Sequence, residues 1–364
     1  MGHSFLRLAA VLVPLMGWTW LPQAAARADD HAVILLYHHV SADTPPSTSV
    51  DPATFDAHLD YLADHHFHVW PLSKILNNIE TGHSIPDNTV ALTFDDAYAS
   101  VFSEAYPRLK RRGWPFTVFV STDYIDKHYK NYMTWDQLRE VTEHGAELGN
   151  HSRSHPHLAR RGDNESEEHW RERVRAEISG AQRRLEAETH HPIKVFAYPY
   201  GEFSPSLEAI VTDLGFYAVG QQSGAVGKVS DLRAAPRFPM ADGYADQKQF
   251  ITKIHTRPLP VTVQAPNDPF LGSGPMRPKL RLRIGEGPFR LDGLACYASG
   301  QGRMLLDWVD RKQRVVDISP REPLKTGGRF KYNCTAPSSE ESGVYFWYSH
   351  LWMKKNPDGT WYND

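Results

Sequence analysis

The chain has 364 residues, enough for one large domain and a smaller one, and a composition of 41% hydrophobic and 23% charged residues argues against disorder. The formal net charge is -3, and basic runs such as "RLKRRG" fall in predicted helices with a solvated face. The sequence therefore gives no indication of a nucleic-acid partner.

The first 28 residues have the pattern of a secretory signal. Arg7 precedes an apolar run at 8–21, and "ARA" at 26–28 is a small-x-small cleavage pattern. A membrane anchor is less well supported, because the run is short for a bilayer span and no later segment reaches transmembrane length. We expect a chain that is exported, periplasmic or secreted, with no transmembrane segment after cleavage.

Strand-like runs and helical patterns then alternate from about residue 31 to residue 255. "AVILLYHHV" precedes a helix that begins after Asp51, and "TVALTF", "PFTVFVST", "AELGNHS" and "KVFAYPYG" are each followed by a helix. Two shorter strand candidates, "FYAVGQQ" and "LRAAPRF", precede a last helix, "ADQKQFITKIH". Such alternation predicts an α/β fold, and about seven strands favour a distorted (β/α)7-type barrel over 29–258.

Polar residues follow the predicted strands at the same end. "YHH", "FDD", "GNHS", "YPYG" and "PRF" each close a strand, and in a barrel these ends share one face. Asp95 and Asp96 are adjacent carboxylates at such an end. One carboxylate is enough to cap the following helix, so the second needs a function of its own.

His151 and His155 are four residues apart in "GNHSRSHPHL", a spacing that can bring two imidazoles to one metal ion. Two imidazoles and one carboxylate form a hydrolytic metal site, and the second carboxylate is then available as a general base. The residues alone leave a structural alternative open, in which the carboxylates cap a helix and the histidines are solvated.

Three of these motifs resemble a known family. "TFDDAY", "NHSRSH" and "YPYG" are similar to the first three signature motifs of the polysaccharide deacetylases of carbohydrate esterase family four, the NodB homology domain, over about 33–260. The run that begins "YHHVSADTPP" is most similar to the exported bacterial deacetylases of poly-β-1,6-N-acetylglucosamine. The resemblance implies a metal-dependent hydrolase that removes N-acetyl groups from a polysaccharide and releases acetate.

Carried over by residue, the resemblance implies Asp95 as the general base and Asp96, His151 and His155 as metal ligands. It implies Zn²⁺ as the metal, with Co²⁺ or Ni²⁺ as alternatives. It also places the backbone amide of Tyr200 beside the tetrahedral oxyanion.

The sequence departs from the family pattern at two positions. Ala97 stands where a glycine commonly follows the two aspartates, and Ala197 stands where an arginine often orients the base. We expect Arg237, in "APRFP", to orient Asp95 instead, with a surface ion pair as the alternative.

The general acid has two candidates. The family often uses a late histidine, which "ITKIH" matches at His255, but that residue falls on a predicted outer helix. His38 ends a strand on the active face, so we expect it to protonate the leaving amine. His39 is expected to be a loop histidine without a catalytic role.

Beyond Arg257 the helical periodicity stops. Residues 259–278 are rich in proline and glycine and are interpreted as a linker. Short strand-like runs over 279–364 predict a smaller β-sandwich domain. An oxidising compartment would let Cys296 pair with Cys334.

One aromatic strand of this domain suggests carbohydrate binding. We expect Phe346, Tyr348 and Trp352 on one face, and Tyr345 and Trp347 on the other. Such rings stack on sugars, although core packing explains at least one face equally well.

Two classes of function remain at this point. The favoured class is a polysaccharide N-deacetylase, and the other is an exported carbohydrate-binding protein that keeps the barrel without catalysis. Within the enzyme class, chitin oligomers, peptidoglycan or acetylated xylan are alternative substrates. An exopolysaccharide synthesis or export complex is the expected protein partner.

Overall fold

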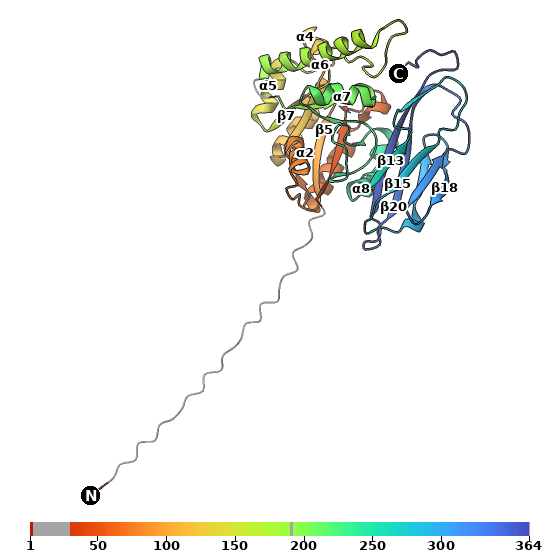
Figure 1. Ribbon diagram of the computed structural model, residues 1–364. Helices are drawn as coiled ribbons and strands as arrows, with labels where there is room; N and C mark the ends of the chain where they lie inside the picture. The colour runs from red at the N-terminus through yellow and green to blue at the C-terminus, as the bar shows by residue number, and fades with distance from the viewer. Residues whose placement is uncertain (3–29, 190–191, 364) are drawn as a thin grey trace.

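The computed structural model describes residues 1–2, 30–189 and 192–363 and contains an α/β part and a β-rich part (Figure 1). The signal segment predicted for 1–28 lies outside the described residues apart from its first two. None of the described helices combines the length and the apolar character that a membrane crossing requires.

A curled sheet forms the centre of the α/β part. Its main strands lie side by side in chain order, and each neighbouring pair is parallel. These strands are β1 (His31–Tyr37), β5 (Thr89–Phe94), β6 (Phe116–Val120), β7 (Ala146–Asn150), β8 (Val195–Ala197) and β9 (Tyr217–Val219). Short β4 (His68–Val69) pairs with β5, and β10 (Val226–Gly227) runs antiparallel to β1. Parallel strands in chain order are typical of barrel-like α/β folds.

Residues 235–239 bridge the first and last strands of this curled sheet. The Ala235 amide donates to the Ala218 carbonyl at 2.8 Å, beside β9. Three residues later, β11 (Phe238–Pro239) pairs with Leu35 and Leu36 of β1. The α/β class and the curled, barrel-like sheet predicted from the sequence are confirmed.

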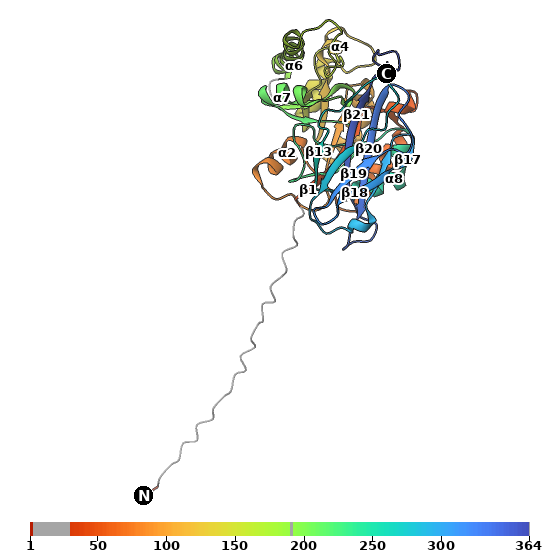
Figure 2. The ribbon, with the colours of Figure 1, turned by 45° about the vertical axis from the view of Figure 1, so that its right-hand side comes forward.

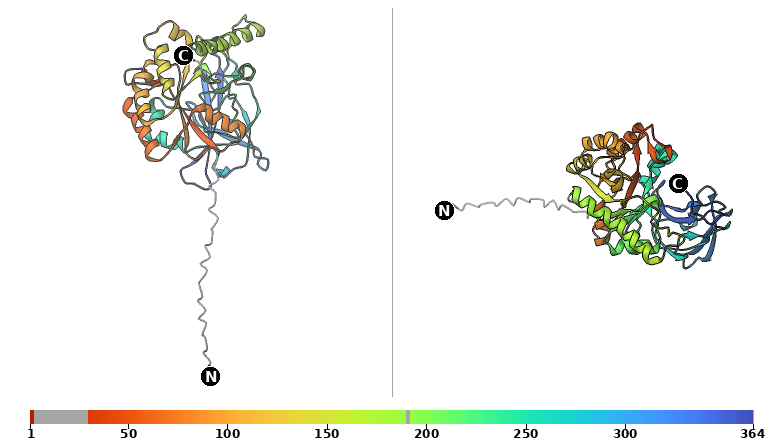
Figure 3. Two further views of the ribbon diagram at one scale, coloured as in Figure 1. Left: turned by 90° about the vertical axis from the view of Figure 1, so that its left-hand side faces the viewer. Right: turned by 90° about the horizontal axis from the view of Figure 1, so that it is seen from above.

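Helices cover the outside of the curled sheet (Figure 3). They are α1 (Pro52–Asp64), α2 (Leu72–Thr81), α3 (Tyr106–Arg112), α4 (Thr122–Asp126), α5 (Trp135–Glu143), α6 (Glu167–Thr189), α7 (Pro205–Asp213) and α8 (Gln247–Ile254). The Asp51 side chain caps α1 by accepting from the amides of Ala53 and Thr54. Gly113 ends α3 with φ of 64°, a conformation that glycine adopts without strain. Strands such as β1 and β5 are buried along almost their whole length. This is because helices cover the outer face of the sheet and side chains fill the inside of its curl.

The β-rich part is a sandwich of two sheets (Figure 2). One sheet contains β12 (Arg257–Pro258), β14 (Phe270–Leu271), β16 (Ala295–Ala298), β17 (Gly302–Arg303), β20 (Gly328–Pro337) and β21 (Tyr345–Lys354). The other contains β13 (Val261–Ala265), β15 (Leu280–Ile284), β18 (Leu305–Asp310) and β19 (Val315–Ser319). Apolar side chains from both sheets form a common core, as expected for a sandwich.

The interpretation of 259–278 as a linker is wrong in part. This segment contains β13, which pairs with β15, and β14, which pairs with β21, so it belongs to the sandwich sheets. The backbone groups of this segment form hydrogen bonds with strands that are distant in the sequence. Such pairing leaves no local signal in a stretch rich in proline and glycine, so the sequence did not predict these strands.

Cys296 on β16 and Cys334 on β20 are directly opposite in the strand register and form a disulfide. The pairing that export would permit is therefore present in the structure. It joins two neighbouring strands of one sheet.

Both faces of β21 are covered by protein over most of its length. Phe346 and Trp352 are buried in the sandwich core, whereas the Trp347 ring lies 5.3 Å from that of Phe238 in the barrel. Of the aromatic side chains proposed for sugar stacking, Tyr345 alone is exposed. The sequence suggested an exposed aromatic face, and the docking of the sandwich on the barrel explains why the structure lacks one.

Candidate active site

The polar residues singled out in the sequence lie at the carboxyl ends of the parallel strands. Asp95 and Asp96 follow β5, His151 follows β7, and Tyr200 follows β8. Strand ends of a curled parallel sheet converge, which brings together residues that are about 100 positions apart in the chain.

Asp96, His151 and His155 form a cluster that can hold a cation. The Asp96 Oδ1 atom lies 3.4 Å from Nε2 of each histidine. One ligand atom from each of the three residues lies within 4.8 Å of the others. One carboxylate and two imidazoles are a donor set that divalent transition metals accept, with further positions open to water or substrate.

The two imidazoles are prepared for a metal in different ways. Nδ1 of His151 donates a hydrogen bond to the Ala197 carbonyl at 2.7 Å, so the lone pair of the neutral ring is on Nε2, toward Asp96. Burial, and then the neighbouring His151, lower the pKa of His155 to about 4, so this ring is neutral at pH 7. Neutral imidazoles with oriented lone pairs are what metal ligation requires.

Asp95 is held by Arg237 in a buried ion pair. The guanidinium Nη1 and Nη2 donate to Oδ1 and Oδ2 at 2.7 and 2.8 Å. Arg237 also donates from Nε to the Gly220 carbonyl at 2.8 Å and from Nη1 to the Thr93 hydroxyl at 3.1 Å. Although burial opposes it, the Arg237 charge lowers the pKa of Asp95, and the carboxylate stays ionised at neutral pH.

Several site residues have left-handed backbone conformations without being glycine. The φ angles are 73° at Asp96, 58° at Ala97, 54° at His155 and 59° at Tyr200. Each such residue costs on the order of 1 kcal/mol, so the rest of the fold must stabilise these loops. Ala97 adopts this conformation where glycine would do so without strain.

Of the candidate general acids, the structure places His38 and not His255 beside the aspartates. His38 is partly buried directly after β1, close enough for its charge to act on Asp95, Asp96 and His155. His255 follows α8, with Nε2 at 2.9 Å from the Tyr61 hydroxyl of α1.

His39 belongs to a separate contact. Its ring is stacked on that of Tyr98 at 3.6 Å, and burial lowers its pKa to about 4. A neutral, buried, stacked ring agrees with the expectation of a structural role.

The Tyr200 ring packs against the metal-ligand candidates. It lies 4.4 Å from the His155 ring and is stacked on His157 at 3.9 Å. The loop that carries Tyr200 thus contacts His155 of the Asp–His–His cluster through the tyrosine ring.

Glu202 anchors this loop to the C-terminal part of the chain, a contact that the sequence analysis missed. Its buried carboxylate accepts from Arg160 Nε at 3.0 Å and from the Tyr362 hydroxyl at 2.6 Å. Hydrogen bonds from His157, Arg160 and Tyr362 outweigh burial and lower the pKa of Glu202 to about 2. Because 160 residues separate Glu202 from Tyr362, no local pattern predicts the contact.

Four tyrosines beside the site were also missed. Tyr98 and Tyr132 pair across two loops, and Tyr124 is stacked on Tyr132 at 4.8 Å, with Tyr129 next to both. The density of tyrosine in "TDYIDKHYKNYMTW" was the available signal, because aromatic residues gathered in a loop are often a binding surface.

Comparisons with known proteins agree with this arrangement. Residues 83–219 match the family model described as polysaccharide deacetylase. The poly-β-1,6-N-acetyl-D-glucosamine N-deacetylase of Escherichia coli K12 is 22% identical over 261 residues, which are 62% of this chain and 38% of that protein. The enzyme of the same name from Staphylococcus aureus MRSA252 is 22% identical over 57% of this chain and 73% of its own length.

A solved structure shows the same fold. The deacetylase PplD of Streptococcus pyogenes, in complex with acetate, superposes with a TM-score of 0.56 at 20% identity, covering 62% of this chain and 98% of its own. The chain thus shares the fold of this deacetylase, and its residues 83–219 are similar to the polysaccharide deacetylase family.

Proposed function

We propose that the chain is a metal-dependent hydrolase that removes N-acetyl groups from N-acetylglucosamine residues of an exported polysaccharide and releases acetate. The main support is the Asp96–His151–His155 cluster directly beside Asp95, which Arg237 holds ionised. A carboxylate that binds no metal but lies next to a metal site is suited to general-base catalysis.

The ligand set fits a transition metal, with Zn²⁺ favoured and Co²⁺ or Ni²⁺ as alternatives. A divalent ion bound there would supply Lewis acidity to the attacking water and to the amide carbonyl. His151 and His155 offer imidazole nitrogens, and Asp96 offers a negative charge that would balance part of the charge of the ion.

Different groups around this cluster carry out the two proton transfers and stabilise the oxyanion. Asp95 accepts the proton of the attacking water, with its orientation fixed by Arg237. The Tyr200 backbone amide donates to the developing oxyanion, where one such hydrogen bond is worth about 3 kcal/mol in other hydrolases. His38 donates a proton to the nitrogen of the leaving amine.

The substrate we propose is poly-β-1,6-N-acetylglucosamine, the polymer in the names of the relatives from E. coli and S. aureus. The location we propose is periplasmic or extracellular, where such a polymer is encountered. Chitin oligomers, peptidoglycan and acetylated xylan are the competing substrates, and an exopolysaccharide synthesis or export complex is the proposed partner.

Acetate release from a panel of these glycans, with and without a chelator, tests the proposal. We expect activity on N-acetylated β-1,6 oligomers, loss of activity after metal removal, and recovery on adding Zn²⁺. Activity that survives thorough metal removal would contradict the mechanism. Glycan binding without acetate release from any substrate would favour the non-catalytic carbohydrate-binding alternative.

A further inference from the structure

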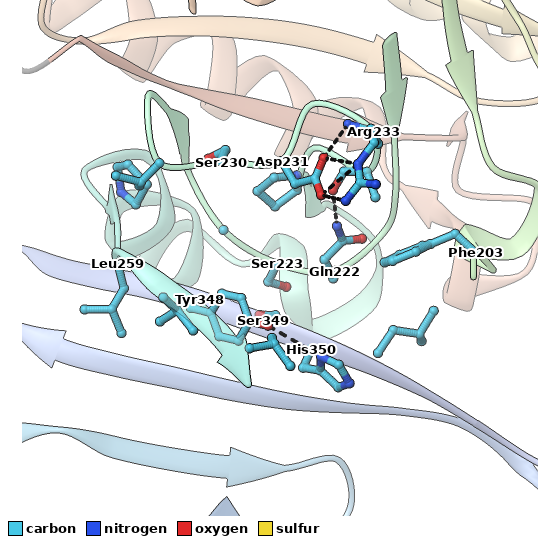
Figure 4. Close-up of a pocket in the computed structure, with 18 of the residues that line it drawn as sticks. Phe203, Gln222, Ser223, Ser230, Asp231, Arg233, Leu259, Tyr348, Ser349 and His350 are labelled. Carbon is cyan, nitrogen blue, oxygen red and sulfur yellow. Dashed lines mark hydrogen bonds and ion pairs between the residues drawn. The ribbon is translucent and has the colours of Figure 1, made fainter. Parts of the chain in front are cut away.

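A cavity of about 570 Å³ lies between the barrel and the sandwich, and none of the Asp–His–His residues lines it. Figure 4 shows Gln222, Asp231 and Arg233 of the 220–236 segment on one side and Tyr348 and Ser349 of β21 on the facing side. The start of α7 contributes further residues. The volume falls in the range of about 300–1,000 Å³ typical of small-molecule sites.

The side chains that line this cavity carry more negative than positive charge. Glu208 and Asp231 are both acidic, and Arg233 is the sole arginine or lysine among the lining residues, all of which the structure describes. Asp231 is the main partner of the Arg233 guanidinium and accepts a hydrogen bond from its Nε at 2.9 Å. Glu208 is farther away, at 3.6 Å from Nη2 of Arg233. Burial lowers the pKa of the lining residue His350 to about 4, so it adds no charge at neutral pH.

Glu208 is therefore an incompletely paired carboxylate in a buried position. It is 8% exposed, and its carboxylate accepts no hydrogen bond from any described residue. Burial, opposed by Arg233, raises the pKa of Glu208. Since unpaired buried charge is costly, a cation in the cavity would stabilise this carboxylate.

The remaining walls suit a ring with apolar faces and hydroxyl groups. Phe203, Trp347 and Tyr348 supply aromatic surface, which packs against the C–H face of sugars. The Nε2 atom of His350 is buried and has no hydrogen-bond partner among the described residues. A hydroxyl group of a ligand would satisfy such an atom.

The cavity and the catalytic site share two chain segments. Phe203 comes three residues after Tyr200, and the Gln222 carbonyl accepts from the Arg237 amide at 3.0 Å. The segments that follow β8 and β9 thus contribute residues to both sites.

We propose that this cavity binds a protonated 2-amino sugar, namely a glucosamine unit of the partly deacetylated polymer. The inference rests on the proposed function, because glucosamine units are the product of that reaction. The ammonium group pairs with Glu208, and the sugar ring packs between Phe203 and the aromatic residues of β21. The site retains chains that have already been processed.

Titration of the metal-loaded full chain tests this proposal, with the Trp347 indole NMR signal as the readout and Trp347→Phe to assign it. The probes are a β-1,6-linked glucosamine trisaccharide, its fully N-acetylated counterpart and the simple polyamine spermidine. We expect the amino trisaccharide to bind at least tenfold more tightly than either comparison. Glu208→Gln, which keeps the side-chain shape, should weaken its binding at least tenfold.

Asp231→Asn removes the second carboxylate and should also weaken binding. Asp213→Asn is the matched control, since Asp213 ends the same helix α7, pairs with Arg175 and is not a lining residue. Equal affinity for the two trisaccharides, or unchanged binding in both cavity variants, would overturn the proposal. Spermidine binding as tightly as the amino trisaccharide would overturn the sugar assignment.

The deacetylase proposal has a separate readout. The initial rate of acetate release from the N-acetylated trisaccharide should be unchanged in Asp213→Asn, whose position is outside the cavity. If the unmodified chain releases no acetate, the proposed reaction is wrong, while the titration still decides whether the cavity binds an amino sugar.

Discussion

Asp95 and Asp96 are neighbours in the sequence, but their side chains have different surroundings. Both oxygens of Asp95 accept from Arg237, whereas Asp96 faces two imidazoles. The left-handed backbone at Asp96 turns the chain between them. The two aspartate side chains are identical, but their contacts give them different electrostatic environments.

Substituting each aspartate separates these assignments. Asp96→Asn removes a charged ligand, so we expect metal content to fall. Asp95→Asn should retain the metal and lose about 10²–10⁴-fold in turnover, the range for removing a general base. Metal analysis of both purified variants, beside acetate release, distinguishes the roles; the opposite pattern would reverse them.

Arg237 controls the charge state of Asp95. In Arg237→Gln the burial that raises the pKa of Asp95 is no longer opposed, so the acidic limb of the pH–rate profile should move to higher pH. Breaking a buried pair should also cost about 3–5 kcal/mol of stability. Urea unfolding and the pH–rate profile of the variant measure the two effects.

The same ion pair gives stability a defined pH dependence. The pKa of folded Asp95 is below its unfolded value of 3.8, so the pair stabilises the protein above that pH. This contribution is lost as the pH falls through the folded-state pKa. Arg237→Gln should show a smaller loss of stability over that acidic range.

Whole elements determine which histidine reaches the site. His38 follows β1, whose carboxyl end faces the cluster, while His255 follows α8 and contacts α1 on the outside of the sheet. Helices of barrel-like folds lie outside the strands, away from the site at the strand ends.

We therefore expect His38→Ala to retain metal and lose roughly 10²-fold or more in turnover. His255→Ala should lose the contact with Tyr61, which costs about 1 kcal/mol of stability, and keep its turnover. Acetate release and thermal unfolding of folded, metal-loaded variants test the pair. Loss of turnover in His255→Ala alone would identify His255 as the acid.

How much the sequence predicts also differs by element. The parallel strands were recognisable because each is a buried apolar run followed by polar residues, and this pattern is local. Strands β13 and β14 were missed because pairing with distant strands defines them. In the site, the position of Arg237 beside Asp95 was predicted, but the hydrogen bond of Glu202 to Tyr362 depends on how the two parts dock.

On the scale of the molecule, the sandwich supports the loops of the catalytic face. Lys331 of β20 donates to the Gln221 carbonyl at 2.6 Å, and Arg329 lies 3.6 Å from Glu202. Tyr362 completes the contact from the C-terminal segment. These groups act on the site through the loops that carry Tyr200 and Arg237.

Tyr362→Phe removes one hydrogen bond to the buried Glu202 carboxylate and should lower the free energy of unfolding by about 1–3 kcal/mol. Turnover should fall while metal content stays unchanged, because the loop of Tyr200 is less firmly held. Tyr297→Phe, at an exposed position of β16, is the control and should change neither quantity. Unchanged stability in Tyr362→Phe would contradict this supporting role.

The short bridge at 235–239 bears on how such a chain can be recombined in evolution. Phe238 on this bridge packs against Trp347 of the sandwich, and Arg237 beside it reaches the Asp95 carboxylate. A barrel inherited without its sandwich would place Phe238 in water at the seam of the sheet. In this chain a recombination that removed or replaced the sandwich is therefore expected to persist only where another residue covers Phe238.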